Sequence, residues 1–414
     1  MNRSVDLIAS VAFVVLMLGG AAWVFPRSAE AFSAWTLPIF SAVALGLTLA
    51  LVRDWPWLRG FVLALVVAIL IGGAPMRTNT AVAHFAGASL GVLAMVWVGR
   101  VVTTSQRLRW MTVIYLGGGL AVLLLGLTGS YFEELSPFMR RLTQGLPDLR
   151  LGLVGLGPFG YVNPNALAAA VLLVMPLGLA VVTLKTGNRV DFLTLLPLGV
   201  LVVLVGGFVL IVTQSKSAFL AVWLTTAAVV VRGPRSATWR VVTTLALVAP
   251  ALLAVGAVQF VSRDVFVLKA GSLWSTVHDR AEVMAFAFEQ LKQSPWVGIG
   301  LNDFRSLYHT PVPSDIAHAH NVFLQTALDI GVLGLVAYLS VLAFILVRAD
   351  QLARGAASLT RTVAVGAALS LLAVSAFGFG DAVPLGTKIG MLQWLLCGAI
   401  LAAWRVQREP ARVS

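Results

Sequence analysis

Apolar runs long enough to form membrane-crossing helices recur along this chain, and they constrain its fold more than any other feature. A bilayer core about 30 Å thick needs roughly 20 apolar residues per helical span. Only a helix or a closed barrel satisfies every backbone hydrogen bond inside that core, and barrel strands are about half as long as these runs. The sequence therefore predicts an all-α, polytopic integral membrane protein.

Composition agrees with this fold class. Charged residues make up 11% of the chain and apolar residues 59%, whereas a soluble domain usually carries about a quarter charged residues. We expect about twelve transmembrane helices in a single membrane domain, residues 1–414. The expected spans lie near residues 5–25, 35–52, 58–74, 81–99, 110–130, 165–184, 192–213, 217–232, 240–262, 322–347, 360–380 and 385–404.

The first expected span has a second interpretation. Arg3 precedes its apolar stretch and Ser28-Ala29-Glu30-Ala31 follows it, an arrangement that also fits a cleavable signal peptide. We expect a retained helix, and either interpretation leaves the orientation of the second span unchanged.

The distribution of charge predicts the orientation of the chain. If the N-terminus is cytoplasmic, the cytoplasmic segments hold the whole formal excess of +12, and the opposite face is close to neutral. This bias follows the positive-inside rule, so we expect both termini in the cytoplasm. The basic excess then indicates contact with anionic membrane lipids and not nucleic-acid binding. The single cysteine, Cys397, lies in an apolar span, which excludes an internal disulfide and disfavours a cysteine-ligated metal.

Two segments on the non-cytoplasmic face are long enough to carry a site: residues 131–163, and residues 263–320 between the ninth and tenth spans. The longer loop holds four of the chain's five histidines. Proline and glycine punctuate it at Pro295–Gly300, so we expect short helices joined by turns on the membrane surface. Loops longer than about 15 residues are usually functional, and we place the catalytic site in residues 263–320.

Two cations near the non-cytoplasmic membrane edge are candidates for binding an anion. Arg280 lies in the long loop, and Lys216 lies in the short turn between the seventh and eighth spans. A cation at the bilayer edge is costly unless it faces a cavity or an anion, and two of them suit a lipid-linked diphosphate. Two simpler interpretations stay open: Lys216 extends to lipid phosphate, and Arg280 forms a surface ion pair with Asp279 or Glu282.

The scarcity of acidic residues argues against a metal site built from carboxylate oxygens. The first loop on this face has Glu30 as its only acid and contains no clustered carboxylates, which such a site requires. We therefore expect no metal and no cofactor, although the paired histidines of the long loop are a weak metal signature.

The residues His318-Ala319-His320-Asn321 lead into the tenth span and form the sharpest local feature. Asn321 is a suitable N-cap for that helix. If the helix begins earlier, a polar stripe of His318, Asn321, Gln325 and Asp329 runs down one face of an apolar span and faces the bundle interior or a cavity. A histidine at this position is able to accept a proton from a sugar hydroxyl. The alternative is that both histidines are purely structural.

These motifs together resemble the O-antigen ligases and the related O-antigen polymerases of bacterial envelopes. The segments that carry the resemblance are Tyr161–Ala168, Thr213–Ala218, Arg280, Pro295–Gly300, Phe304, His318–Asn321, Leu324, Gln325, Gly331 and Gly334. The resemblance implies a metal-independent glycosyltransferase of the bacterial inner membrane, with its active site facing the periplasm. Its donor is a glycan on undecaprenyl diphosphate. The acceptor is the lipid A core in ligases and a second lipid-linked repeat unit in polymerases.

Carried over position by position, the resemblance assigns Arg280 and Lys216 to the donor diphosphate and His320 to the general base. The family commonly has arginine where this chain has Lys216, and lysine lacks the planar fork of a guanidinium. The helical stripe favours His318 as the base; we prefer His320, because a preceding loop need not keep helical phase. Further substrate contacts are expected from His318, Asn321, Gln325, Asn163, Asn165, Tyr308, His309 and Arg305.

We therefore expect an O-antigen ligase that inverts the anomeric centre, with an O-antigen polymerase as the first alternative. A flippase or transporter of lipid-linked sugars is an alternative of another class, but such proteins tend to show repeated halves with broken helices, and no repeat is evident here. A peptidoglycan polymerase is a third possibility, and it leaves the histidine pair unexplained.

Overall fold

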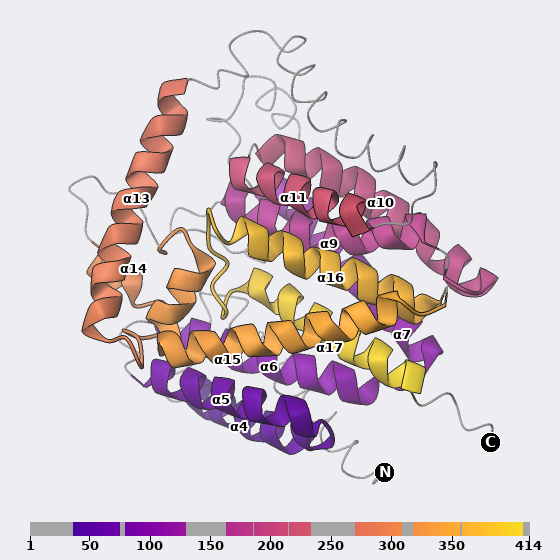
Figure 1. The fold of residues 1–414 in the computed structure, drawn as a ribbon, viewed down its shortest axis with the longest axis horizontal. Coiled ribbons are helices and arrows are strands. Elements are labelled where there is room, and N and C mark those ends of the chain that lie inside the picture. Colours follow the sequence, from indigo (N-terminus) through magenta and orange to yellow (C-terminus); the bar gives the residue numbers. More distant parts are fainter. Residues whose placement is uncertain are drawn as a thin grey trace.

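The computed structural model describes residues 36–74, 79–129, 163–184, 186–213, 215–232, 270–308, 318–356 and 358–408. Within these ranges the regular structure is helical, with one short 3-10 turn at Val52–Asp54 (Figure 1). This confirms the all-α class for the described part of the chain. The predicted spans at 5–25 and 240–262, and nearly all of the 131–163 loop, lie outside the described residues.

Eight of the described helices are long and apolar enough to cross a membrane, so the chain is a multi-pass membrane protein. They are α5 (Pro56–Gly73), α6 (Asn79–Val101), α7 (Ser105–Gly129), α9 (Pro164–Thr183), α10 (Arg189–Thr213), α15 (Val322–Ala353), α16 (Leu359–Phe377) and α17 (Lys388–Arg408). Two further predicted spans form the shorter helices α4 (Thr36–Leu51) and α11 (Lys216–Arg232).

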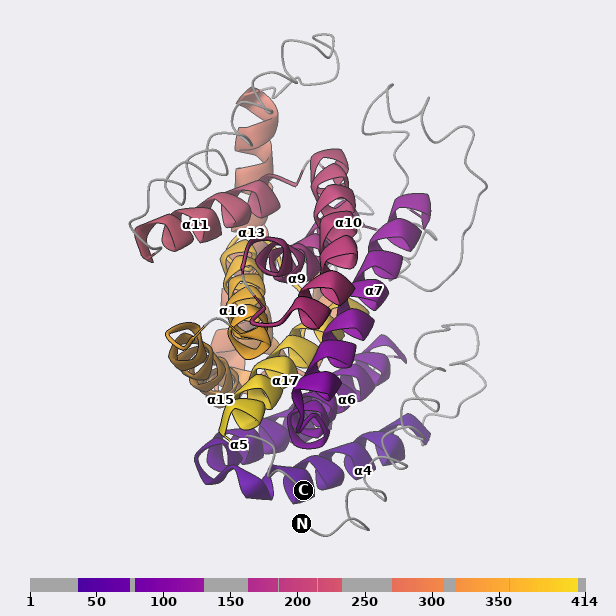
Figure 2. The same ribbon diagram turned by 90° about the vertical axis from the view of Figure 1, so that its right-hand side faces the viewer.

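The core of the bundle lies around α6, α9 and α17, with other helices packed about them (Figure 2). Glycine allows the closest of these approaches. A Cβ atom on Gly91 of α6 would lie 2.2 Å from the ring of Trp394, which is almost completely buried on α17. Small residues at such crossings let membrane helices pack backbone to backbone.

Asparagine caps begin two of the helices. The side chain of Asn163 accepts a hydrogen bond from the Asn165 N–H, and Pro164 occupies the first turn of α9. The side chain of Asn321 accepts hydrogen bonds from the N–H groups of Phe323 and Leu324, each at 3.0 Å. The predicted N-cap at Asn321 is thus confirmed, and the alternative of a helix that begins before His318 is wrong.

One long helix departs from the bundle direction. In Figure 1, α13 (Ala270–Gln293) runs across one end of the bundle, and α14 (Phe304–Leu307) follows it. Both belong to the predicted 263–320 loop, although α13 is much longer than the short helices we expected there. The residues before α15 and those after α16 lie at this same end, because α16 runs back along α15.

Candidate active site

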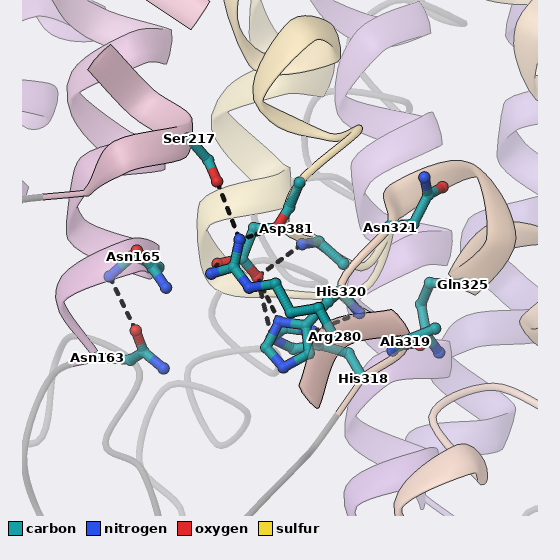
Figure 3. Close-up of polar contacts among 12 residues, drawn as sticks. Asn163, Asn165, Ser217, Arg280, His318, Ala319, His320, Asn321, Gln325 and Asp381 are labelled. Atoms are coloured by element: carbon teal, nitrogen blue, oxygen red, sulfur yellow. Dashed lines mark hydrogen bonds and ion pairs between the residues drawn. The ribbon is translucent and has the colours of Figure 1, made fainter. Parts of the chain in front are cut away.

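Side chains from four separate segments meet at the end of the bundle that α13 crosses (Figure 3). They come from the start of α11 (Ser217), from α13 (Arg280), from the residues before α15 (His318 and His320) and from the connection between α16 and α17 (Asp381). The sequence predicts three of these segments as parts of the site. Asp381 is not among the predicted residues.

Asp381 lies at the centre of the cluster and is only 1% exposed. Its Oδ1 atom is 3.5 Å from Nε2 of His318 and 3.5 Å from Nδ1 of His320, and its Oδ2 atom is 3.7 Å from the Arg280 guanidinium. Burial raises the pKa of the Asp381 carboxyl, but the neighbouring His320 and His318 imidazoles and the hydrogen bond from the Ala382 N–H outweigh this effect and hold the pKa below its ordinary value. The carboxyl is therefore ionised near neutral pH.

The Arg280 guanidinium is fixed on three sides. Its Nη1 atom donates to the Ser217 hydroxyl at 3.2 Å and to the Gly380 carbonyl at 2.5 Å, while Nη2 faces Asp381. Gly380 is needed for this fit, because a Cβ atom there would lie 2.7 Å from Ser217 Oγ. About a quarter of the Arg280 side chain stays exposed, at 24%. An anion at the surface of the cluster therefore has access to a preoriented cation.

The two histidines are held in a tight, irregular backbone. His320 adopts a left-handed conformation with φ of 50°, which is uncommon for a residue with a side chain. Its N–H donates to Nδ1 of His318 at 3.3 Å, and the two rings meet edge to face at 4.7 Å. Each side chain is about one-fifth exposed, so both rings line the surface of the cluster.

The two imidazoles differ in which nitrogen remains available. In His318, Nδ1 accepts from the His320 N–H and Nε2 faces Asp381, so both nitrogens are engaged. In His320, Nδ1 faces Asp381, and Nε2 has no partner within the part of the chain that the structure describes. Burial lowers the pKa of His318 to about 4; the Asp381 carboxylate opposes this shift, whereas His320 and Arg280 add to it. His318 is accordingly neutral near pH 7.

The polar stripe predicted on α15 faces inward but reaches no open surface. Gln325 is fully buried, accepts from the Ala319 N–H at 2.9 Å and donates to Asp329 at 2.7 Å. Asp329 is 1% exposed. The predicted substrate contact from Gln325 is therefore not available in this structure, because its polar atoms face protein groups.

The other predicted contact residues are more scattered. Tyr308 stacks on Phe304 and meets Phe286 edge to face, so its ring belongs to a small aromatic cluster beneath α13. Asn163 and Asn165 lie together at the start of α9, apart from the Arg280 cluster in Figure 3. Arg305 lies on α14, and His309 is outside the described residues.

Lys216, the second predicted cation, is exposed in the first turn of α11. It directly precedes Ser217, whose hydroxyl accepts from Arg280. The two predicted cations therefore lie at the same end of the bundle, as their assignment to one diphosphate requires.

The cluster also has a metal-compatible spacing that the sequence did not reveal. His318, His320 and Asp381 offer ligand atoms that all lie within 4.8 Å of one another, and they form the one such group in the described ranges. Nitrogen and carboxylate ligands at this spacing suit a transition metal. However, the Arg280 guanidinium already supplies a positive charge to Asp381, and it would repel a second cation there.

Asp381 is the functional candidate that the sequence analysis missed. A carboxylate in the short connection between two apolar spans is expensive to keep near a membrane, and such a residue usually marks a site. That signal was present in the sequence, but nothing local indicated which distant side chains it would face.

Part of the chain matches a known protein family. Residues 199–339 match the family model described as O-Antigen ligase, and no curated protein matches the chain. The matched segment runs from α10 into α15 and contains Ser217, Arg280 and both histidines, while Asp381 lies beyond it. The resemblance inferred from the sequence motifs is thereby confirmed.

Proposed function

We propose that this chain, whose residues 199–339 form an O-antigen ligase family domain, is a ligase that transfers a glycan from undecaprenyl diphosphate to a hydroxyl of the lipid A core. The family match makes the chain a membrane glycosyltransferase of the ligase or polymerase type that uses lipid-linked glycans. One observation carries the finer proposal: an imidazole with a free nitrogen and a fixed guanidinium face the same surface, joined through Asp381.

In this proposal His320 is the general base. The Asp381 carboxylate lies 3.5 Å from Nδ1 of His320. In the proposed mechanism this charge keeps the proton on Nδ1 and orients the ring, so that Nε2 carries the lone pair. His318 is less suited to this role, since its Nδ1 already accepts from the His320 N–H and its Nε2 faces Asp381. His318 instead holds the His320 backbone in its strained conformation.

Arg280 acts on the leaving group. The acceptor oxygen attacks the anomeric carbon from the face opposite the diphosphate, its proton passes to Nε2 of His320, and the carbon–oxygen bond to the diphosphate breaks. The electron pair of that bond remains on the diphosphate, where Arg280 stabilises the added charge. Cations fixed before the reaction need no reorganisation, which makes such stabilisation effective. Lys216 supplies a second, more mobile cation, and the displacement inverts the anomeric centre.

Charge distribution supports a periplasmic site. Arginines gather at the end of the bundle opposite the cluster, where Arg405 donates to the Arg100 carbonyl at 3.0 Å and Arg100 donates to the Leu51 carbonyl at 3.3 Å. The positive-inside rule assigns that end to the cytoplasm. The termini then lie in the cytoplasm of a bacterium and the cluster faces the periplasm, where the lipid-linked donor and the lipid A core meet.

Further substrate contacts in this proposal come from residues outside the cluster. Asn163 and Asn165 offer amides, and Arg305 and Tyr308 lie near α13. Asn321 offers only its NH2 group, which faces the Phe379 carbonyl at 3.4 Å, because its oxygen caps α15. We retain His309 among these on its position in the chain. Contact with sugar hydroxyls or core phosphate is the chemistry that such groups provide.

Reconstitution tests the proposal directly. The purified protein in lipid vesicles is given a glycan on undecaprenyl diphosphate together with either lipid A core or a second lipid-linked repeat unit. A single shifted product on the lipid A core supports the ligase. A ladder of products made from repeat units alone replaces it with the polymerase, and movement of the donor across the bilayer without covalent transfer replaces it with a flippase.

A further inference from the structure

A chain of buried hydrogen bonds runs from α15 to the peptide between the two histidines. The Ala319 N–H donates to Gln325 Oε1 at 2.9 Å, and Gln325 Nε2 donates to Asp329 Oδ1 at 2.7 Å. The same Oδ1 atom accepts from the Asn302 N–H at 3.0 Å. Ala319 and Gln325 are fully buried, and Asp329 is 1% exposed. Hydrogen bonds in such surroundings are shielded from water, and losing one partner leaves a costly unpaired group.

These hydrogen bonds act on the two histidines through Ala319, the residue between them. Ala319 has no functional side chain, but its peptide lies between His318 and His320, and His320 follows it in a left-handed conformation. The Asn321 cap fixes the other side of the same turn. The direction of both imidazoles toward Asp381 therefore depends on where Gln325 holds the Ala319 N–H.

The hydrogen bonds from Ala319 through Gln325 end at Asp329, which lies beside an interruption in α15. At Gly331 the backbone has φ of 76°, and the usual bond between the Val332 N–H and the Leu328 carbonyl is replaced. The Val332 N–H donates instead to the Pro295 carbonyl at 2.8 Å, and the Leu328 carbonyl accepts from the Ile299 N–H at 2.7 Å. The segment that follows α13 is thus inserted into the break in α15.

Two glycines make this insertion possible. A Cβ atom on Gly331 would lie 2.0 Å from the Trp296 carbonyl oxygen, and one on Gly298 would lie 2.3 Å from the Leu328 carbonyl oxygen. Asp329 lies beside the break and binds Asn302, a few residues further along the inserted segment. The helix that carries Arg280 and the turn that carries the histidines are therefore joined through one buried junction.

We propose that Gln325 and Asp329 are positioning residues for the transfer reaction, which set the two histidines in fixed register with Arg280 through the Ala319 peptide. This inference rests on the proposed function and replaces a direct substrate contact by Gln325. A displacement of about 1 Å at a reacting group can cost on the order of 100-fold in rate, so a rigid link of this kind has a measurable effect.

The direction of the central hydrogen bond provides the test. In Gln325→Glu, a carboxylate oxygen replaces the donor that faces Asp329, so two carboxyl groups oppose each other. In Asp329→Asn, the retained Oδ1 still accepts from Gln325 and Asn302.

We expect Gln325→Glu to lower kcat about 10- to 100-fold while the donor KM stays within about threefold, because the histidines and not the diphosphate contacts are displaced. Asp329→Asn should stay within about threefold of the wild-type kcat, because its Oδ1 still accepts both hydrogen bonds. Gln393→Glu is the matched control, since Gln393 is a buried glutamine on α17 that bonds to Tyr338. Its kcat should not change. Normal turnover in Gln325→Glu, or an Asp329→Asn variant as slow as Gln325→Glu, would overturn the inference.

A second measurement does not depend on activity. Hydrogen exchange at the Ala319 amide, followed by mass spectrometry, should become at least about tenfold faster in Gln325→Leu, because the acceptor is lost. Unchanged exchange would overturn the positioning role. If exchange responds as expected but the wild-type protein transfers no glycan, the proposed function fails and the buried link stands.

Discussion

Asp381 faces Nδ1 of His320 but Nε2 of His318, in each case at 3.5 Å from its Oδ1 atom. One carboxylate therefore serves both imidazoles through opposite ring nitrogens. Since His318 also accepts from the His320 N–H through Nδ1, only His320 keeps a nitrogen without a partner among the described residues. This asymmetry separates two residues that the sequence alone left nearly equivalent.

The first prediction concerns the base. His320→Ala should lower glycan transfer by roughly two to four orders of magnitude, because general-base catalysis typically contributes that much. Binding of the lipid-linked donor should persist, since the base acts on the acceptor hydroxyl. Initial rates and direct donor-binding measurements on the same preparation check this. His318→Ala should do less; an inactive His318→Ala beside a normal His320→Ala would contradict the assignment.

The second prediction concerns Asp381. Asp381→Asn keeps the size of the side chain but removes the charge that orients His320, and transfer should fall by about 100-fold or more. Arg280 keeps two of its acceptors, Ser217 and Gly380, so donor affinity should change less than turnover. Asp350→Asn is the control, because Asp350 forms an exposed pair with Arg354 on α15. Equal rates in the two variants would remove Asp381 from the mechanism.

The third prediction concerns acid stability. The pKa of His318 is lowered to about 4 in the folded protein, below its ordinary value near 6.5. Between these two values the unfolded chain binds a proton that the folded chain does not, so stability falls as the pH drops through this window. The contribution is on the order of 3 kcal/mol. The other charged or titratable groups that face this ring are Asp381, His320 and Arg280.

His318→Asn tests this contribution. Asparagine keeps an oxygen that can accept from the His320 N–H, but it does not titrate. The fall in thermal unfolding temperature between pH 7 and pH 4.5 should be smaller in His318→Asn than in the wild-type protein. Parallel pH profiles for the two proteins would show that His318 is not held neutral by burial.

The fourth prediction concerns the donor diphosphate. Arg280→Ala should abolish transfer with the fold intact, because the other cation, Lys216, is exposed and lacks fixed partners of its own in the described residues. Lys216→Arg should be tolerated or should raise turnover, since a guanidinium binds phosphate through two parallel bonds. Lys292→Ala serves as the control, because Lys292 pairs with Glu289 on the exposed side of α13. Full activity in Lys216→Ala would contradict a role in diphosphate binding and favour the interpretation that Lys216 contacts lipid phosphate.

The fifth prediction concerns metals. Transfer should survive a chelator, because in the proposed mechanism Arg280 occupies the side of Asp381 where a cation would otherwise neutralise it. The assay is the reconstituted transfer with EDTA, followed by back-titration with magnesium, manganese and zinc. Loss of transfer on chelation with recovery on one metal would assign His318, His320 and Asp381 to that ion instead.

Much of the fold followed from local properties of the chain. Apolar runs become helices in a bilayer because each helix satisfies its own backbone, so the positions of α5, α6, α7, α9, α10, α15, α16 and α17 were predictable to within a few residues. The cap at Asn321 is equally local, as its side chain binds N–H groups only two and three residues away. Arg280 and the two histidines were identified because polar residues are rare and costly at a membrane edge.

Only the tertiary structure decided how these residues are combined. Asp381 reaches the histidines because α16 and α17 pack beside α15, and no local pattern specifies that neighbour. Helical spacing places Gln325 on the polar face of α15, but it does not show which groups cover that face. In the structure the Ala319 peptide covers Gln325, so the residue is not a substrate contact. The break at Gly331 depends on the carbonyl of Trp296 approaching from another segment. Local sequence thus determines which groups lie at the membrane edge, whereas packing between distant helices decides which of them share a charge or a hydrogen bond.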